Sequence, residues 1–147
     1  MSLIKKSAVE MAAALEKKEI TSVELTQEHL NRISEVDGKV KAFLHIDKDG
    51  ALNQAKEVDA KRHKGEKLAP LAGVPLALKD VLTQKGIPTT CGSKMLEGWR
   101  PPYDSTVVSN LKKNGVVILG KTNMDEFAID RKSTRLNSSH IPLSRMP

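Results

Sequence analysis

The sequence is poor in several residue types, and each shortage excludes a class of protein. Cys91 is the single cysteine, so no internal disulfide can form. Aromatic residues make up 3% of the chain, which is too few for platforms on which nucleic-acid bases stack. No apolar run approaches the roughly 20 residues of a membrane-spanning helix. Neither a Walker sequence nor a G-x-G-x-x-G loop is present to bind phosphate.

The remaining composition is that of a globular protein. The chain has 147 residues, 29% charged and 39% hydrophobic, which suffices for one domain with a core. The N-terminal residues Met1–Lys6 lack the apolar segment of a signal peptide. Together with the lone cysteine, this predicts a cytoplasmic protein with no membrane partner. Cys91 could be a nucleophile, but a half-buried structural thiol is the simpler interpretation.

The net charge of +6 raises an alternative function, a basic module that binds nucleic acid. The distribution of the charge argues against it. Residues 130–147 carry four basic residues and one acid, which is half of the net charge. The other half is spread over the first 129 residues, where it is an ordinary net charge. Strong, salt-sensitive RNA binding that survives deletion of residues 130–147 would support this alternative.

The first half of the chain predicts helices with one short strand. Helical spacing of apolar residues indicates a helix over residues 5–18. A capping box at 21–24 starts a second helix, which we expect to end at Asp37-Gly38. Residues 42–46 are a strand candidate, and Asp47 or Asp49 could cap a third helix that ends near His63. The histidines are scattered without ligand spacing, so no metal site is predicted.

The second half predicts a βαβ unit with a parallel sheet. Its parts are a strand at 76–78, a helix at 105–114 and a β-branched strand at 116–119. Asp104 or Ser105 caps the helix and Gly115 ends it, and its inner face is expected to carry Val107, Val108 and Leu111. Ligands of such sheets bind beyond the carboxyl ends of the strands, where Lys79 and Lys121 fall.

Lys79 is the most informative residue, because it is the only lysine in an otherwise apolar run, residues 71–80. A buried cation costs several kcal/mol unless it is paired or loses its proton. Asp80 is unsuited as its partner, because neighbouring side chains of a strand point to opposite faces. Lys79 is therefore either a functional amine or a surface residue just past the strand.

Four segments, in order and with plausible spacing, resemble the amidase signature family. They are Gly73-Val74-Pro75-Leu76-Ala77-Leu78-Lys79-Asp80, Thr89-Thr90-Cys91-Gly92-Ser93, Asp104-Ser105-Thr106-Val107-Val108 and Gly120-Lys121-Thr122-Asn123-Met124-Asp125-Glu126-Phe127-Ala128. The resemblance covers residues 1–128. The Asn-Met-Asp-Glu-Phe-Ala form is most like the branch of the family that provides the A subunit of tRNA-dependent amidotransferases; another amidase of small amides is the alternative.

The resemblance implies an α/β fold, of which this chain would be the N-terminal part: helices packed on a partial mixed sheet with a βαβ unit. It also implies a Ser–cis-Ser–Lys triad in which Lys79 is the catalytic lysine. A lysine can act as a base only when desolvation or a nearby cation lowers its pKa, and we expect the apolar residues 76–78 to desolvate Lys79. Thr122, Asn123 and Asp125 are weaker candidates for substrate binding; a strand-to-helix turn capped by Asn123 is the structural alternative.

For that branch, the resemblance implies a subunit that hydrolyses glutamine and releases ammonia, so that Glu-tRNA(Gln) becomes Gln-tRNA(Gln). The expected partners are the B and C subunits of a heterotrimer, with tRNA bound mainly by the B subunit. This chain is expected to bind no cofactor, since ATP and Mg²⁺ are used by the partner subunit.

Both serines of the triad are expected downstream in a Gly-Ser-Ser-Gly-Gly-Ser segment, which this sequence lacks. The chain alone should therefore be inactive. The family pattern stops after Ala128, and we interpret residues 129–147 as a non-native, disordered tail. Codons for 130–140 and 144–147 can be written as two segments of a widely used sequencing-library adapter, in frame; a natural basic tail is the alternative. Genomic reads that cross codon 129 into the same tail would refute the adapter origin.

Overall fold

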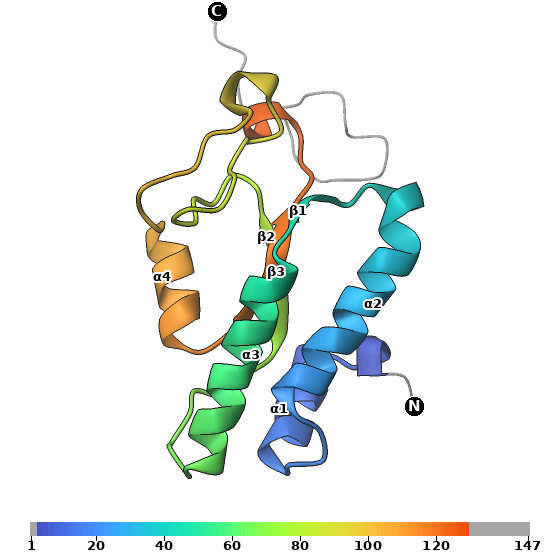
Figure 1. Cartoon of the computed structure of the whole chain (residues 1–147), viewed down its shortest axis with the longest axis vertical. Coiled ribbons are helices and arrows are strands. Elements are labelled where there is room, and N and C mark those ends of the chain that lie inside the picture. The colour runs from blue at the N-terminus through green and yellow to red at the C-terminus, as the bar shows by residue number, and fades with distance from the viewer. Residues whose placement is uncertain (1–2, 130–147) are drawn as a thin grey trace, which may run out of the picture.

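A computed structural model describes residues 3–129 of the chain, so the predicted tail at 129–147 lies outside the described residues except for Ile129. Helices and three strands alternate along the sequence (Figure 1). Their bounds are η1 Leu3–Lys5, α1 Ala8–Glu16, α2 Ser22–Val40, β1 Phe43–Ile46, α3 Lys48–His63, β2 Pro75–Lys79, η2 Lys94–Leu96, α4 Thr106–Lys113, β3 Val117–Thr122 and η3 Glu126–Ala128.

The three strands form one mixed sheet in the order β1-β3-β2. β2 runs parallel to β3 and is connected to it through α4, which confirms the predicted βαβ unit. β1 pairs with β3 in the antiparallel direction. The register of β2 against β3 shifts by one residue, because Leu76 pairs with Ile118 but Ala77 pairs with Gly120. Leu119 is thus the extra residue of a bulge, and the faces of β3 exchange there.

The sheet lies between two helical layers, as Figure 1 shows with α4 on one side and α2 and α3 on the other. Val117 and Leu119 of β3 pack with Leu30 of α2 and with Ala51 and Ala55 of α3. Ile118 points to the other face and packs with Leu78 and Val108. A third cluster joins α1 and α2 below the start of β2, through Met11, Leu15, Leu25 and Val74.

Side-chain caps determine where the helices begin. The predicted capping box of α2 is confirmed: the Thr21 backbone N–H donates to Glu24 Oε2 (2.8 Å), and the Glu24 N–H donates to Thr21 Oγ1 (3.1 Å). Between the alternatives, Asp47 caps α3 by accepting the Gly50 N–H. Ser105, rather than Asp104, caps α4.

Two details of the helices differ from the sequence prediction. α2 does not end at Asp37-Gly38 but continues to Val40, where Lys41 adopts a left-handed conformation with φ 57°. Asp37 contributes to this later end, because its carbonyl accepts the Lys41 N–H and its carboxylate accepts the Ala42 N–H. On α4, Val107 is 48% exposed and only Val108 is fully buried, so the inner face is narrower than predicted.

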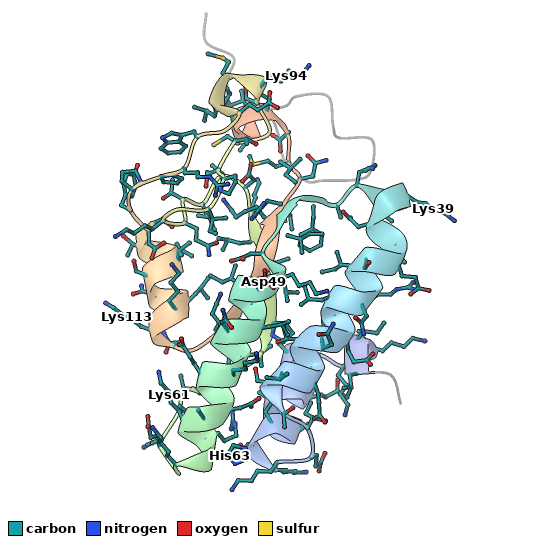
Figure 2. All side chains as sticks on the ribbon, in the orientation of Figure 1. Lys39, Asp49, Lys61, His63, Lys94 and Lys113 are labelled. Carbon is teal, nitrogen blue, oxygen red and sulfur yellow. The ribbon has the colours of Figure 1, made fainter. Side chains whose placement is uncertain are left out.

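Within residues 3–129, no helix is long and apolar enough to cross a membrane. Charged side chains extend from the outer surfaces of the helices, as Figure 2 shows for Lys39, Lys61 and Lys113.

Candidate active site

The carboxyl ends of β2 and β3 place two lysines in opposite environments. Lys79 is the last residue of β2 and pairs in register with Thr122, while Leu78 pairs with Lys121. Paired residues share a face of the sheet and neighbours alternate, so Lys79 and Lys121 point to opposite faces. Lys79 is exposed, whereas Lys121 is completely buried on the face covered by α4.

Lys121 is held by an ion pair and a hydrogen bond. Its Nζ lies 3.0 Å from Asp80 Oδ1 and donates to Thr89 Oγ1 at 2.9 Å. The side chains of Lys121 and Asp80 are 0% and 1% exposed. The second oxygen of Asp80, Oδ2, accepts hydrogen bonds from the Thr90 N–H (2.9 Å) and the Thr90 hydroxyl (2.7 Å). Both oxygens of the buried carboxylate are therefore satisfied, as the desolvation of an ion pair requires.

Burial and pairing act on Lys121 in opposite directions. Burial lowers the pKa of the Lys121 ammonium, while the hydrogen bond and the charge of Asp80 raise it. The net direction is downward, so burial is the larger effect. Lys121, and not Lys79, is the desolvated cation of this sheet.

This arrangement corrects one prediction and adds one site. We expected the apolar run before Lys79 to desolvate its amine, but Lys79 is exposed. β2 is an edge strand, and Ala77, on the same face as Lys79, is exposed too. The Asp80–Lys121 pair was missed. Strict alternation along β3 would give Lys121 the same face as Leu119, and the bulge at Leu119 reverses that assignment.

The loop that contains Thr89 and Thr90 is tied to the segment after β3. Ser93 Oγ donates to Glu126 Oε1 (2.5 Å), and the Phe127 N–H donates to the Cys91 carbonyl (2.9 Å). At Gly92, with φ 69°, a Cβ atom would lie 2.8 Å from the Met124 carbonyl oxygen, so the two segments approach closely. In Figure 1 these segments gather beyond the carboxyl ends of β2 and β3, at the top.

Cys91 lies within this loop and is partly buried. Burial raises the pKa of its thiol, and the Asp80 carboxylate raises it further, while Lys121 acts in the opposite direction. A raised pKa lowers the thiolate fraction at neutral pH, which favours the structural interpretation over a nucleophile.

The weaker candidates occupy different positions at this end of the sheet. Thr122 shares a face with Lys79 and its hydroxyl donates to the Leu78 carbonyl at 3.4 Å. Asn123 connects the end of β3 to the end of α2: its amide nitrogen donates to the Lys41 carbonyl (3.1 Å) and its oxygen accepts the Met124 N–H (2.8 Å). Asp125 directly precedes η3. The structure thus brings Thr122 beside Lys79, whereas the Asn123 side chain hydrogen-bonds the backbone of Lys41 and Met124.

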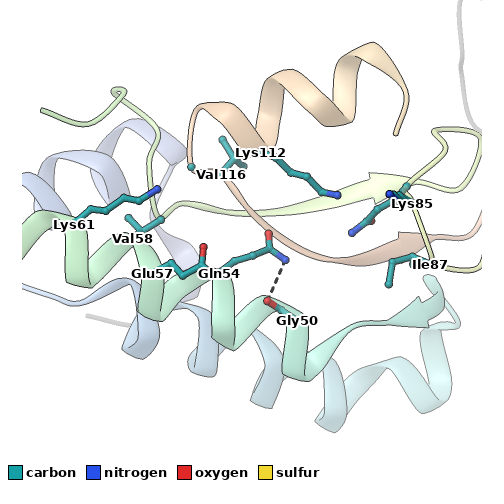
Figure 3. A pocket seen from close by; sticks show the side chains of 11 residues that line it. Gly50, Gln54, Glu57, Val58, Lys61, Lys85, Ile87, Lys112 and Val116 are labelled. Carbon is teal, nitrogen blue, oxygen red and sulfur yellow. Dashed lines mark hydrogen bonds between the residues drawn. The ribbon is translucent and has the colours of Figure 1, made fainter. Parts of the chain in front are cut away.

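A cavity of about 420 Å³ lies elsewhere, between α3 and α4 (Figure 3). Gln54 lines it. The Gln54 amide nitrogen donates to the Gly50 carbonyl, and its oxygen accepts the Ile118 N–H of β3, so that a side chain takes the place of a strand partner there. Neither Lys79 nor the three weaker candidates line this cavity. Among residues 3–129, no three His, Cys, Asp or Glu side chains are grouped so that they could hold a metal ion.

Comparisons with known proteins match the arrangement of these segments. The chain is 61% identical over 140 residues to the A subunit of the glutamyl-tRNA(Gln) amidotransferase of Streptomyces coelicolor, which covers 95% of this chain and 28% of that protein. It is 57% identical over 153 residues to the protein of the same name from Streptomyces avermitilis, covering 100% of this chain and 30% of the relative. The chain therefore spans less than a third of the curated relatives it matches.

Solved structures agree with this relationship. The native peptide amidase from Stenotrophomonas maltophilia superposes with a TM-score of 0.79 at 36% identity, over 84% of this chain and 26% of that one. A bacterial aryl acylamidase of the amidase signature enzymes gives a TM-score of 0.78 at 27% identity, over 83% and 26% of the two chains. The amidase family pattern matches residues 24–138. This chain belongs to the amidase family.

Proposed function

We propose that this chain is the N-terminal part of an amidase that hydrolyses glutamine, with Lys79 as its catalytic base. The main support for this proposal is the position of Lys79. It ends a parallel strand, where ligands of such sheets bind, and its side chain is exposed beside Thr122. The other lysine in the family-like segments 73–80 and 120–128 is Lys121, which the buried ion pair already engages.

In this proposal the parts of the parent protein beyond residue 128 cover Lys79 and supply the two serines. Lys79 then takes a proton, through the middle serine, from the serine that attacks the side-chain amide of glutamine. The proton returns through the middle serine to the leaving amine, the C–N bond breaks, and ammonia leaves an acyl-enzyme. Water then hydrolyses the acyl-enzyme, which releases glutamate and restores the serine. Ser93, the serine of the nearby loop, is no replacement for the missing nucleophile, because it donates its hydroxyl to Glu126. The chain alone is inactive in this account.

The similarity to the A subunits of amidotransferases supports a specific setting for this reaction. Ammonia would pass to a B subunit that uses ATP and Mg²⁺ and binds most of the tRNA, with a C subunit completing a cytoplasmic heterotrimer. Glutamine is then the amide donor that converts Glu-tRNA(Gln) to Gln-tRNA(Gln).

A second candidate is an amidase that acts on a small amide without tRNA. It is favoured by the similar peptide amidase structure at 36% identity. The residues that select the substrate would then lie beyond residue 128.

The experiment uses a graft, in which residues 1–128 of this chain replace the matching segment of the Streptomyces coelicolor relative, produced with the B and C subunits of that organism. We expect the graft to hydrolyse glutamine and to amidate Glu-tRNA(Gln) when ATP is present. Hydrolysis of peptide amides without glutamine-dependent amidation would favour the second candidate. A soluble, assembled graft with neither activity would contradict the proposed function.

A further inference from the structure

Lys79 and Asp80 are neighbours in sequence with opposite surroundings. The Lys79 side chain is exposed on one face of the sheet, and the Asp80 carboxylate is 1% exposed on the other. The backbone of Asp80 extends the strand pairing, because its N–H donates to the Thr122 carbonyl at 3.3 Å. One peptide unit therefore separates the candidate base from a buried negative charge.

A carboxylate this close to a lysine opposes the role proposed for Lys79. A base must be neutral before it accepts a proton, and a nearby negative charge favours the ammonium form. Once the rest of the parent protein covers Lys79, this attraction acts over several ångströms with little screening. The charge of Asp80 must therefore be balanced by a cation other than Lys79.

The charged and titratable groups around Asp80 come from several segments. Lys121 of β3 is its ion-pair partner at 3.0 Å. Cys91 of the loop interacts electrostatically with both Asp80 and Lys121. His45 of β1 pairs in register with Lys121, and Glu126, the first residue of η3, accepts the Ser93 hydroxyl. Asp125 is a further acid next to Glu126. Among these groups Lys121 is the cation in contact with Asp80.

We propose that Lys121 is a positioning residue for Lys79: it neutralises the Asp80 carboxylate from the far face of the sheet, so that Lys79 is free to lose its proton. This inference rests on the proposed function of Lys79. Lys121 does not touch the substrate. It acts through Asp80, and the same contacts fix the end of β2 against Thr89 and Thr90, which sets the direction of the Lys79 side chain.

The test is the pH dependence of kcat/KM for glutamine hydrolysis by the graft. Lys121→Met removes the compensating cation but leaves Asp80, which Thr90 still hydrogen-bonds. The acidic limb of the profile reports the pKa of the essential base in the free enzyme. This limb should move upward by about one pH unit, so that activity on it falls about tenfold. The double variant Asp80→Asn/Lys121→Met removes both charges, and its acidic limb should return to that of the unmodified graft. Lys113→Met, at an exposed lysine of α4, is the matched control and should leave the limb in place.

A purely structural ion pair would lower kcat without moving the acidic limb, and an unmoved limb in Lys121→Met would overturn the inference. If Lys121→Met does not fold, Lys121→Gln decides the question, because it removes the charge while keeping a polar donor at this position, and the same upward shift is expected. Lys79→Ala separates the two proposals. Full activity in Lys79→Ala would refute the proposed base, whereas loss of activity there with an unmoved limb in Lys121→Met would refute only the role of Lys121.

Discussion

Asp80 and Lys121 connect the carboxyl ends of two parallel strands through a 3.0 Å ion pair from which solvent is excluded. The pair lies on the α4 side of the sheet, behind the exposed Lys79. It joins β2, β3 and the Thr89–Thr90 loop at the edge where the proposed reaction takes place.

The ion pair should show strong coupling in stability. Removing one partner leaves an uncompensated buried charge, so Asp80→Ala should lower the free energy of unfolding by about 3–5 kcal/mol. Asp80→Asn/Lys121→Met should cost much less than the sum of its two single variants. Urea unfolding of the graft and its variants measures this cycle, and additive losses would show that the two side chains do not act as a pair.

Two glycines should respond to alanine in opposite directions. A Cβ atom at Gly120 would collide with the His45 carbonyl and lie 2.9 Å from Ile46 Cα, so Gly120→Ala should separate β1 from β3 and cost about 1–3 kcal/mol. Gly38 lies inside α2, where a Cβ atom would have no neighbour within 4 Å, and Gly38→Ala should stabilise by about 0.5–1 kcal/mol. Thermal unfolding of both variants in the graft tests this contrast, and equal effects would be inconsistent with the observed strand contact.

The start of α2 should lose stability in acid. Hydrogen bonds from the Thr21 backbone N–H and hydroxyl lower the pKa of Glu24 below its usual 4.5. Because the folded-state pKa is the lower one, the contribution of Glu24 is complete above pH 4.5 and is lost as the pH falls through the folded-state value. The difference in melting temperature between the graft and Glu24→Gln should therefore shrink between about pH 6 and pH 3. Glu28→Gln, on the same helix but outside the capping box, serves as the control, and a difference that does not depend on pH would contradict the assignment.

The exposed edge of the sheet should make the 147-residue chain associate with itself. β2 is an edge strand, and Leu76 on it is 36% exposed, as are Leu71 (44%) before the strand and Val81 (39%) after it. Light scattering should detect large species, and Leu76→Lys should reduce them. Val9→Lys makes the same change on α1, at a residue 75% exposed, and should have little effect. A monomer with one sharp thermal transition would contradict this expectation.

Local signals in the sequence predicted much of the fold. The Thr21–Glu24 capping box, the Gly115 turn and the β-branched run before Gly120 each specify their structure through nearby residues, and the βαβ unit follows from their order. The predicted end of α2 was wrong because Gly38 is tolerated within a helix when Asp37 satisfies the backbone N–H groups of Lys41 and Ala42. These signals act over a few residues, so the sequence contains them almost directly.

The candidate site was less accessible from the sequence. Lys79 stood out as a cation in an apolar run, but which lysine is buried depends on the bulge at Leu119, and a bulge forms only when strands pair. Thr89 and Thr90 reach the ion pair across a loop whose course no local pattern specifies. A useful signal was present in retrospect: an acid directly after one predicted parallel strand and a lysine at the end of the next can meet only on the face opposite Lys79.

The most direct test of the central claim is the rate of glutamine hydrolysis by the assembled graft with Lys79→Ala, measured against Lys113→Ala. If Lys79 is the base, Lys79→Ala should lower kcat by about a hundredfold or more with the fold and assembly unchanged, while Lys113→Ala should hydrolyse glutamine at the rate of the unmodified graft. Equal rates for Lys79→Ala and Lys113→Ala would contradict the account.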